Sequence, residues 1–270
     1  GADVYQQLDV KAQYSTETSD QTYVGLTEAD FAADAHNRYG LTQQDEMDNE
    51  HKELTLTHLV DFGLTKVTTT GYFIEFKRDW FKVDKIGGDS ISEVIDCANV
   101  GNCTDSDGVA NNITTEADAI AVLNGEQAAA ISIKHNNRVY ESKGVQTKLS
   151  HELDIGETKH NVELGLRYHE DSASRYQPTE TWQQNNDGSL VYQSTAAPTG
   201  SNIRTTTAKA WSVHLTDDIT TGALVLTPGV RVEDYKIERE GSAGNVADEQ
   251  VVLFGLGATL QLENSVATFV

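Results

Sequence analysis

The feature that most constrains the fold is the stretch from Trp211 to Tyr235, in which apolar and polar residues alternate on both sides of a short polar turn. In its first half the apolar positions are Trp211, Val213 and Leu215, and the second half repeats the pattern after a turn that we place at 217–222. A period of two is typical of strands that have one apolar and one polar side. The stretch therefore predicts an antiparallel strand pair, which raises the question of what its apolar side contacts.

The same alternation recurs along most of the chain. The predicted strands are residues 4–14, 51–61, 64–78, 137–153, 160–172, 204–216, 223–239, 248–262 and a short last one at 265–270 after a turn at 263–264. We also expect a short helix within 115–130 and a hairpin around the Asn-Asp-Gly at 186–188. The sequence thus predicts an all-β, antiparallel fold with about nine main strands.

The connections between these strands alternate in length. Residues 15–50, 79–136 and 173–203 are long and polar, whereas 62–63, 154–159 and 217–222 are short. Short turns at one end and long loops at the other are typical of bacterial outer-membrane β-barrels. Strands of about 11 to 16 residues also exceed the usual five or six and suit a tilted membrane span. We therefore favour a transmembrane barrel, with a soluble secreted carbohydrate-binding β-sandwich as the alternative.

A barrel of this kind carries aromatic residues where its outer face leaves the membrane. The aromatic residues near the long-loop ends are Phe76, Tyr140, Tyr168 and Tyr235, and we expect them to form part of such a girdle. A barrel with a polar interior also accounts for a chain that is only 38% hydrophobic. No run of apolar residues is long enough for a transmembrane helix.

The chain is strongly acidic, with a formal net charge of -22 over 270 residues. Between positions 15 and 50 there are nine acidic residues and one basic residue, and between 79 and 136 there are ten acidic and three basic residues. Such a surface argues against nucleic acid, whose binding depends on clustered Lys and Arg. The ordinary interpretation is a solvated exterior that resists aggregation.

Two cysteines, Cys97 and Cys103, lie in one polar loop without a neighbouring histidine. Their spacing suits a local disulfide better than a zinc site and so favours an oxidising compartment, although two free thiols stay possible. The His-Glu-Asp at 169–171 is best interpreted as a solvated strand end, and we expect no metal site. We also find no nucleophile, acid–base pair or phosphate loop, and expect no enzyme activity.

Several segments resemble the TonB-dependent outer-membrane receptor family, and within it the ferric-dicitrate-receptor-like branch. They are TYVGLTEADF (22–31), RY (38–39), MDNEHKELTLTH (47–58), NNRVYESKGVQ (136–146), LGLRYHED (164–171) and LTPGVRVE (226–233). Each motif is weak alone, but their order and spacing extend over nearly the whole chain.

The resemblance implies that residues 1–270 are part of a β-barrel domain of 22 strands, whose plug domain, TonB box and remaining strands are absent from this sequence. It implies a receptor in the bacterial cell outer membrane, in contact with lipid, that takes up a ferric chelate of the siderophore or ferric citrate type with energy from TonB. The chelate would be cargo, and no cofactor is expected. The alternative is a passive porin or adhesin barrel.

The alternation of side chains between the two faces of each strand identifies a candidate binding site. The residues opposite the apolar side include six arginines, of which all but Arg231 lie in or near the half of the strands next to the long loops. These candidate substrate-binding residues are Arg138, Arg167, Arg175, Arg204 and Arg239. A ring of guanidinium groups could bind an anionic chelate, because arginine offers carboxylates a planar bidentate fork. The purely structural interpretation is that the interior arginines pair with interior carboxylates such as Glu75, Glu163 and Glu233.

Overall fold

The computed structural model describes residues 4–103, 112–240, 247–262 and 266–269, and most of them belong to one antiparallel sheet. The main strands of this sheet are β1 (Tyr5–Ser19), β2 (Glu46–Asp61), β3 (Thr65–Ile86), β6 (Arg138–Ile155), β7 (Thr158–Tyr176), β10 (Ile203–Thr221), β11 (Leu224–Arg239), β12 (Ala247–Leu262) and β13 (Val266–Phe269). The all-β antiparallel fold and its nine main strands, the last one short, are confirmed.

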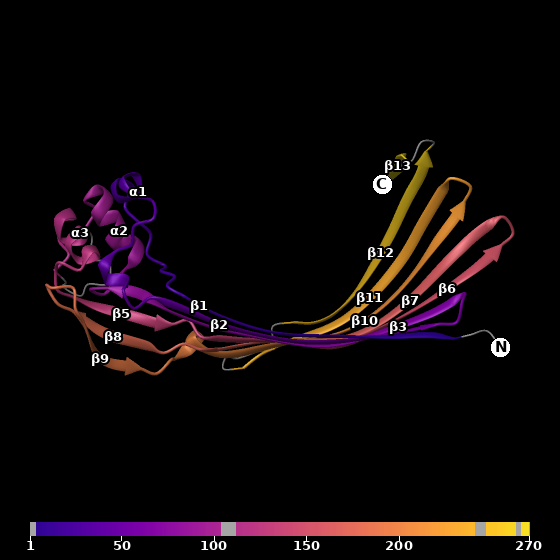
Figure 1. Ribbon diagram of the computed structural model, residues 1–270, viewed down its shortest axis with the longest axis horizontal. Coiled ribbons are helices and arrows are strands. Elements are labelled where there is room, and N and C mark those ends of the chain that lie inside the picture. Colours follow the sequence, from indigo (N-terminus) through magenta and orange to yellow (C-terminus); the bar gives the residue numbers. More distant parts are fainter. Residues whose placement is uncertain (1–3, 104–111, 241–246, 263–265, 270) are drawn as a thin grey trace.

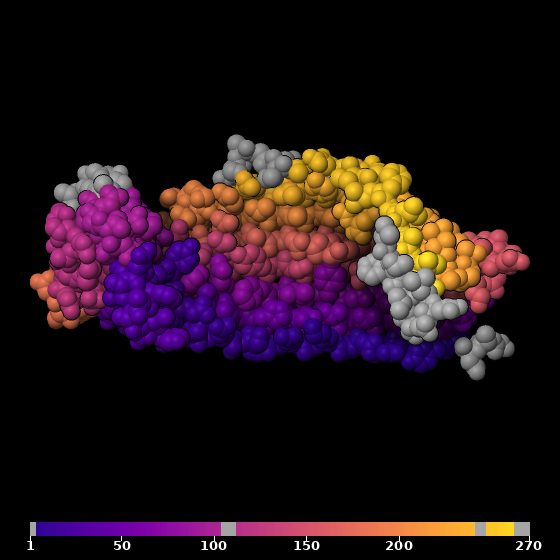
Figure 2. Space-filling view, turned by 90° about the horizontal axis from the view of Figure 1, so that it is seen from above, coloured from indigo at the N-terminus to yellow at the C-terminus, as the bar shows by residue number. Residues whose placement is uncertain are grey.

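These nine strands pair in the order β1-β2-β3-β6-β7-β10-β11-β12-β13. Figure 2 shows the strands side by side, from indigo β1 and β2 at one edge to yellow β12 at the other. The sheet is strongly curved and does not close on itself: over the described residues β1 pairs only with β2, and β13 only with β12 (Figure 1). This is the arrangement expected of a section of a barrel wall.

The sheet has an apolar face and a polar face, as the alternation predicts. Trp211 pairs with Tyr168, Val213 with Leu166, and Leu215 with Leu164, so these residues share the apolar face. On this face Trp211 is 60% exposed, whereas the neighbouring Ser212 on the polar face is 6% exposed. Crowding of the polar side chains indicates that the polar face is the concave one. Because a single sheet leaves these apolar residues exposed rather than buried against a second sheet, the β-sandwich alternative is wrong.

The apolar face changes character towards the long loops. Tyr168 and Trp211 pack with ring centroids 4.7 Å apart. In the next row on this face Glu170 lies between two lysines, with its carboxylate 3.1 Å from Lys143 Nζ and 3.7 Å from Lys209 Nζ. We call this row (Lys143, Glu170, Lys209 and the adjoining Lys236) the charged belt.

The expected aromatic girdle is only partly correct. Tyr168 lies on the apolar face, but Phe76, Tyr140 and Tyr235 lie on the polar face, because the register pairs Phe76 with Tyr140, and Tyr235 with Ala210 beside Trp211. On β3 the apolar face is instead formed by the alternate positions, which include Phe73. Glu75 is also on the apolar face, where it pairs with Lys52 and Lys77, so it is not an interior carboxylate.

Two predicted turns are shorter than expected. β6 continues to Ile155 and β10 to Thr221, and the turns centre on Gly156 and Gly222, both of which have positive φ. Asp217, which we expected in a turn, lies instead within β10, where it contacts His160 Nδ1 at 2.7 Å across the strands. Such cross-strand partners satisfy polar groups that would otherwise favour a turn. The turn expected at 263–264 lies outside the described residues.

The long connections fold into structure of their own. The first and second contain α1 (Glu28–Ala33), a 3-10 turn (Gly40–Thr42), β4 (Asp89–Ser90), α2 (Ile91–Val100), α3 (Glu116–Asn124) and β5 (Ala129–His135). The third contains β8 (Thr179–Gln184), β9 (Leu190–Ala196) and a 3-10 turn (Gly200–Asn202). α3 confirms the expected short helix and the β8–β9 hairpin confirms the one expected around residues 186–188, whereas α1, α2 and β5 were not predicted.

The helices and β5 form a small packed unit at one end of the sheet, which we call the loop lobe (residues 20–45, 83–103 and 112–135; Figure 1). The hydrophobic core of the described residues lies here and includes Leu41, Val83, Ile86, Val122, Leu123, Ile131 and Ile133. Both α2 and α3 begin with a capping box and end at a left-handed glycine, which defines their limits. Cys97 and Cys103 form a disulfide at the end of α2.

Two buried or half-buried ionisable groups lie in the lobe and at its junction with the sheet. Asp45 is 2% exposed and accepts hydrogen bonds from the Val83 amide at 2.9 Å and the Thr22 hydroxyl at 2.8 Å. His135 of β5 contacts Asp79 at 2.8 Å and Glu180 at 3.3 Å, and so joins β3, β5 and β8. None of the helices in the described ranges has the length and apolar character needed to cross a membrane.

Candidate ligand-binding site

Four arginines form one continuous row on the polar face, on four neighbouring strands. Arg78 of β3 pairs with Arg138 of β6, Arg138 pairs with Arg175 of β7, and Arg175 pairs with Arg204 of β10. Adjacent strands in a sheet are about 4.8 Å apart, so each guanidinium group has another on its neighbouring strand. We call Arg78, Arg138, Arg175 and Arg204 the arginine row.

A fifth arginine adjoins the row. Arg239 of β11 pairs with Thr206, two residues from Arg204, and lies on the same face. All five side chains are half-buried. The row lies at the long-loop end of the strands, beyond the charged belt on the opposite face: on β7, Arg175 is five positions further along the strand than Glu170.

The arginine row has no charge partners among the residues that the structure describes. Within the described parts of the chain, none of these five arginines forms an ion pair with an acidic side chain. Arg138 donates hydrogen bonds to neutral groups, the Asn136 side-chain oxygen and the Tyr140 hydroxyl, each at 3.2 Å. The buried Nε atoms of Arg78 and Arg239 have no hydrogen-bond partner among the described residues.

Uncompensated positive charge accumulates around Arg175. Burial, followed by the charges of Arg138, Arg204 and Arg239, lowers the pKa of Arg175 from its usual value. A lowered pKa means that the surroundings disfavour the charged form. An anion placed against the row would offset both the repulsion between guanidinium groups and their incomplete hydrogen bonding.

The other polar-face arginines are arranged differently. Arg167 is eight residues from Arg175 on β7, about 26 Å along an extended strand, and donates to the Tyr72 hydroxyl at 3.0 Å. Arg231 forms an ion pair with Glu233 and donates to the Ser212 hydroxyl at 3.2 Å. The structure therefore brings Arg138, Arg175 and Arg204 together and places Arg239 beside them, but it separates Arg167 from the group.

The carboxylates proposed as arginine partners are bound elsewhere, with one exception. Glu233 pairs with Arg231, as the purely structural interpretation predicted. Glu163 contacts Lys148 at 3.0 Å and His214 at 2.9 Å rather than an arginine. Structural pairing therefore explains Arg231 but not the arginine row.

Arg78 was missing from the sequence-based candidates. It shares its face with Tyr72, Ile74 and Phe76, which form the more apolar of the two sides of β3. The alternation of apolar and polar residues therefore assigned Arg78 to the outside of the barrel. The signal that could have identified it is positional, because Arg78, like the other arginines of the row, lies close to the junction between a strand and a long connection.

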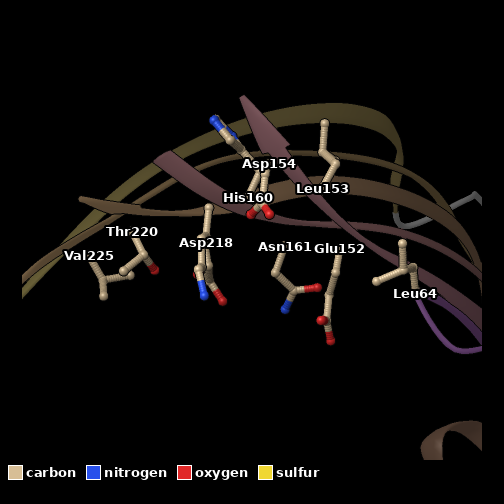
Figure 3. A pocket seen from close by; sticks show the side chains of 10 residues that line it. Leu64, Glu152, Leu153, Asp154, His160, Asn161, Asp218, Thr220 and Val225 are labelled. Carbon is tan, nitrogen blue, oxygen red and sulfur yellow. The ribbon is translucent and has the colours of Figure 1, made fainter. Parts of the chain in front are cut away.

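The opposite, short-turn end of the polar face contains carboxylates and a lysine. A hollow of 520 Å³ is present there, and its lining includes Glu152, Asn161 and Asp218 from three neighbouring strands. Figure 3 shows these three side chains pointing to the same side of the sheet. Lys159 also lines the hollow, so this end carries both signs of charge, whereas the long-loop end carries the arginine row. Across the described residues, no group of three or more His, Cys, Asp or Glu side chains could hold a metal ion.

The comparisons with known proteins agree with this architecture. A family model described as "TonB dependent receptor-like, beta-barrel" matches residues 2–270. No curated protein matches the chain. Among solved structures, the chain is similar to the unliganded ferric citrate transporter FecA, with 18% identity, a TM-score of 0.56, and coverage of 98% of this chain and 32% of that chain.

Two further structures show the same fold. BauA, the ferric preacinetobactin receptor from Acinetobacter baumannii, has 9% identity and a TM-score of 0.62 over 98% of this chain and 36% of its own. The ferric-catecholate import receptor Fiu from K12 E. coli has 15% identity and a TM-score of 0.58 over 95% of this chain and 39% of its own. At these identities the similarity shows the fold alone, and the chain spans about a third of each matched protein.

The matched family consists of bacterial outer-membrane receptors and transporters, not enzymes, that bind iron chelates and interact with TonB. The match extends over nearly the whole length of the curved sheet and its loops. The chain therefore belongs to the TonB-dependent receptor family and is part of its β-barrel domain.

Proposed function

We propose that this chain is the section of an outer-membrane receptor that binds an anionic ferric chelate through its arginine row before TonB-driven uptake. The observation that carries the proposal is that Arg78, Arg138, Arg175 and Arg204 are cross-strand neighbours that form no ion pair among the described residues. Structural arginines in a barrel interior are expected to pair with carboxylates, as Arg231 does.

The two faces of the sheet support a location in the outer membrane. In this proposal the apolar face contacts hydrocarbon, and the Tyr168–Trp211 pair marks the interface with the lipid headgroups. The charged belt then lies among the headgroups, and the arginine row lies beyond it, in the outer mouth of the lumen. Further strands of the parent protein would complete a barrel of about 22 strands around the lumen.

The arginine row suits a ferric chelate for electrostatic reasons. Iron chelates that carry carboxylate or phenolate oxygens expose negative charge, and guanidinium groups bind such oxygens with paired, directional hydrogen bonds. The acidic loops give the remaining surface the opposite sign, so the row is a local positive region in a chain whose net charge is -22. Binding should therefore weaken as ionic strength rises.

The test is ligand affinity of the full-length receptor with ferric citrate as the probe, measured by titration calorimetry. Arg175→Gln and Arg204→Gln remove charge from the row, and Arg231→Gln is the matched control because Arg231 lies on the same face but pairs with Glu233. Loss of a charged hydrogen bond costs about 1.5–3 kcal/mol, so we expect Kd to rise about 10- to 150-fold for each row variant. Equal affinities for the row variants and the control would refute the proposed site.

Energy coupling needs a separate experiment, because the alternative of a passive pore shares the barrel fold. Cells that express the receptor should accumulate labelled iron from the chelate only when TonB is present. Equal uptake in cells that lack TonB would support the passive pore instead.

A further inference from the structure

An apolar hollow lies directly beside the arginine row on the polar face. It has a volume of 310 Å³, and its apolar lining is formed by Ile74, Phe76, Tyr140, Ala173 and Ala208. The register explains this composition. Phe76, Tyr140, Ala173 and Thr206 form one row across four strands, and Ile74, Ser142, Asp171 and Ala208 form the next.

The hollow results from a change in side-chain size along these rows. On β3 and β6, the rings of Phe76 and Tyr140 stack with centroids 6.2 Å apart and an interplanar angle of 24°. On β7 and β10, Ala173 and Ala208 leave the space beside the rings empty. Aromatic faces next to small residues form a shelf that another flat apolar group can cover.

These residues have no evident structural reason to be apolar. They lie on the polar face, so contact with membrane lipid does not account for them, and they are not part of the hydrophobic core, which belongs to the loop lobe. Exposed apolar surface with polar surroundings is typical of a ligand-binding site.

We propose that this hollow binds an apolar, preferably aromatic, arm of the anionic chelate held by the arginine row. The inference rests on the proposed function and narrows its substrate class: the chelate carries an aryl or similar apolar group next to its negatively charged oxygens. A chelate of citrate alone has no group that would fill the hollow.

Charge complementarity fixes the position and direction of this ligand. Tyr140 accepts a hydrogen bond from Arg138 at 3.2 Å, so the hollow and the row share an edge. Arg175 and Ala173 are two residues apart on the same face, about 7 Å along the strand. Asp171 lines the far side of the hollow and disfavours negative charge there. The ligand therefore directs its charged oxygens to the row and its apolar arm into the hollow.

The test compares two probes on the full-length receptor: ferric citrate and the iron(III) complex of 2,3-dihydroxybenzoate, which carries aryl rings. Ala208→Leu fills the hollow, and Phe76→Ala removes one of its rings. The control is Ala210→Leu, which adds the same volume two residues further along β10, where Ala210 does not line the hollow.

For wild type we expect tighter binding of the aryl chelate than of ferric citrate. Stacking and burial of an aryl group support a rise in Kd for the aryl chelate of about tenfold with Ala208→Leu and with Phe76→Ala. With Ala210→Leu, and for ferric citrate with every variant, we expect a change of less than about twofold.

The outcomes separate this inference from the proposed function. If both hollow variants bind the aryl chelate as wild type does, while Arg175→Gln weakens both chelates, the hollow is not a subsite although the arginine row is. If Arg175→Gln changes neither affinity, the proposed function fails, and this inference fails with it. Should Phe76→Ala not assemble, Ala208→Leu decides alone, because it leaves both rings and all five arginines in place.

Discussion

The assignment of the apolar face to lipid predicts a strong, face-specific effect of charge. Leu164 on β7 pairs with Leu149 on β6 and with Leu215 on β10, and it is 40% exposed on the apolar face. In the proposed barrel this row lies in the hydrocarbon region, below the Tyr168–Trp211 pair. Leu164→Arg therefore places a guanidinium group in lipid, where an arginine near the bilayer midplane costs about 2–4 kcal/mol.

The matched control is Thr216→Arg. Thr216 pairs directly with Glu163 on the polar face, so its substitution adds the same charge at a similar depth but next to water and a carboxylate. We expect the folding equilibrium constant to fall about 30- to 900-fold for Leu164→Arg and about threefold or less for Thr216→Arg. Urea-induced unfolding in phospholipid vesicles measures both, and the yield in the outer-membrane fraction provides a cellular readout. Equal effects of the two substitutions would refute the assignment of the faces.

Three further predictions concern the loop lobe and its junction with the sheet, and amide hydrogen exchange of lobe residues measures each. Burial raises the pKa of Asp45 above 3.8, so the folded lobe binds more protons than the unfolded chain, and the stability of the lobe falls as pH rises through the raised pKa. Asp45→Asn should increase the protection of lobe amides from exchange at neutral pH and make this protection less dependent on pH. An unchanged pH dependence would contradict the argument. The hydrogen bond to Asp79 raises the pKa of His135 above 6.5, so the stabilising effect of protonated His135 is complete below pH 6.5 and is lost as pH rises through the raised pKa. His135→Gln should abolish this loss of stability. If the variant still loses stability over the same pH range, another group is responsible. Replacing Cys97 and Cys103, which form the disulfide, with serine should lower the stability of the lobe by about 2 kcal/mol, because the disulfide reduces the chain entropy of the unfolded loop. If amides of α2 and α3 exchange at the wild-type rate in this variant, the disulfide does not stabilise the lobe.

The sequence predicted the strands because barrel strands carry their signal locally. Alternation over 160–172 or 223–239 needs no knowledge of distant residues, and each short turn joins two strands whose register it determines. The hairpin at Gly156 alone determines that Arg138 opposes Arg175, because each lies the same number of residues from the turn. This part of the candidate site was therefore within reach of sequence analysis.

The remainder of the row depends on pairings across long connections. Arg175 opposes Arg204 only because the β8–β9 hairpin between them pairs with β5 and does not lie between β7 and β10. Arg78 opposes Arg138 across the whole of α2, α3 and β5. No local signal sets these registers. The lobe itself was difficult to predict for a related reason, since its core comes from short elements such as the strand end at Val83, which contact each other only in the folded loop.

The most informative error concerns which side of β3 belongs to the polar face. Tyr72, Ile74 and Phe76 form the more apolar side of this strand, so hydrophobicity alone assigns them, and Arg78 with them, to the membrane. The register with β6 places them inside, where Tyr72 receives a hydrogen bond from Arg167 and Phe76 lines the hollow beside the arginine row. Local pattern and global fold disagree on this strand, and such disagreements concentrate where a protein carries residues for function rather than for folding. We therefore assign selectivity among chelates to the same side chains whose location the sequence pattern predicted wrongly. Substitution of Phe76 tests both interpretations, because it should leave membrane assembly intact and change which chelate is bound.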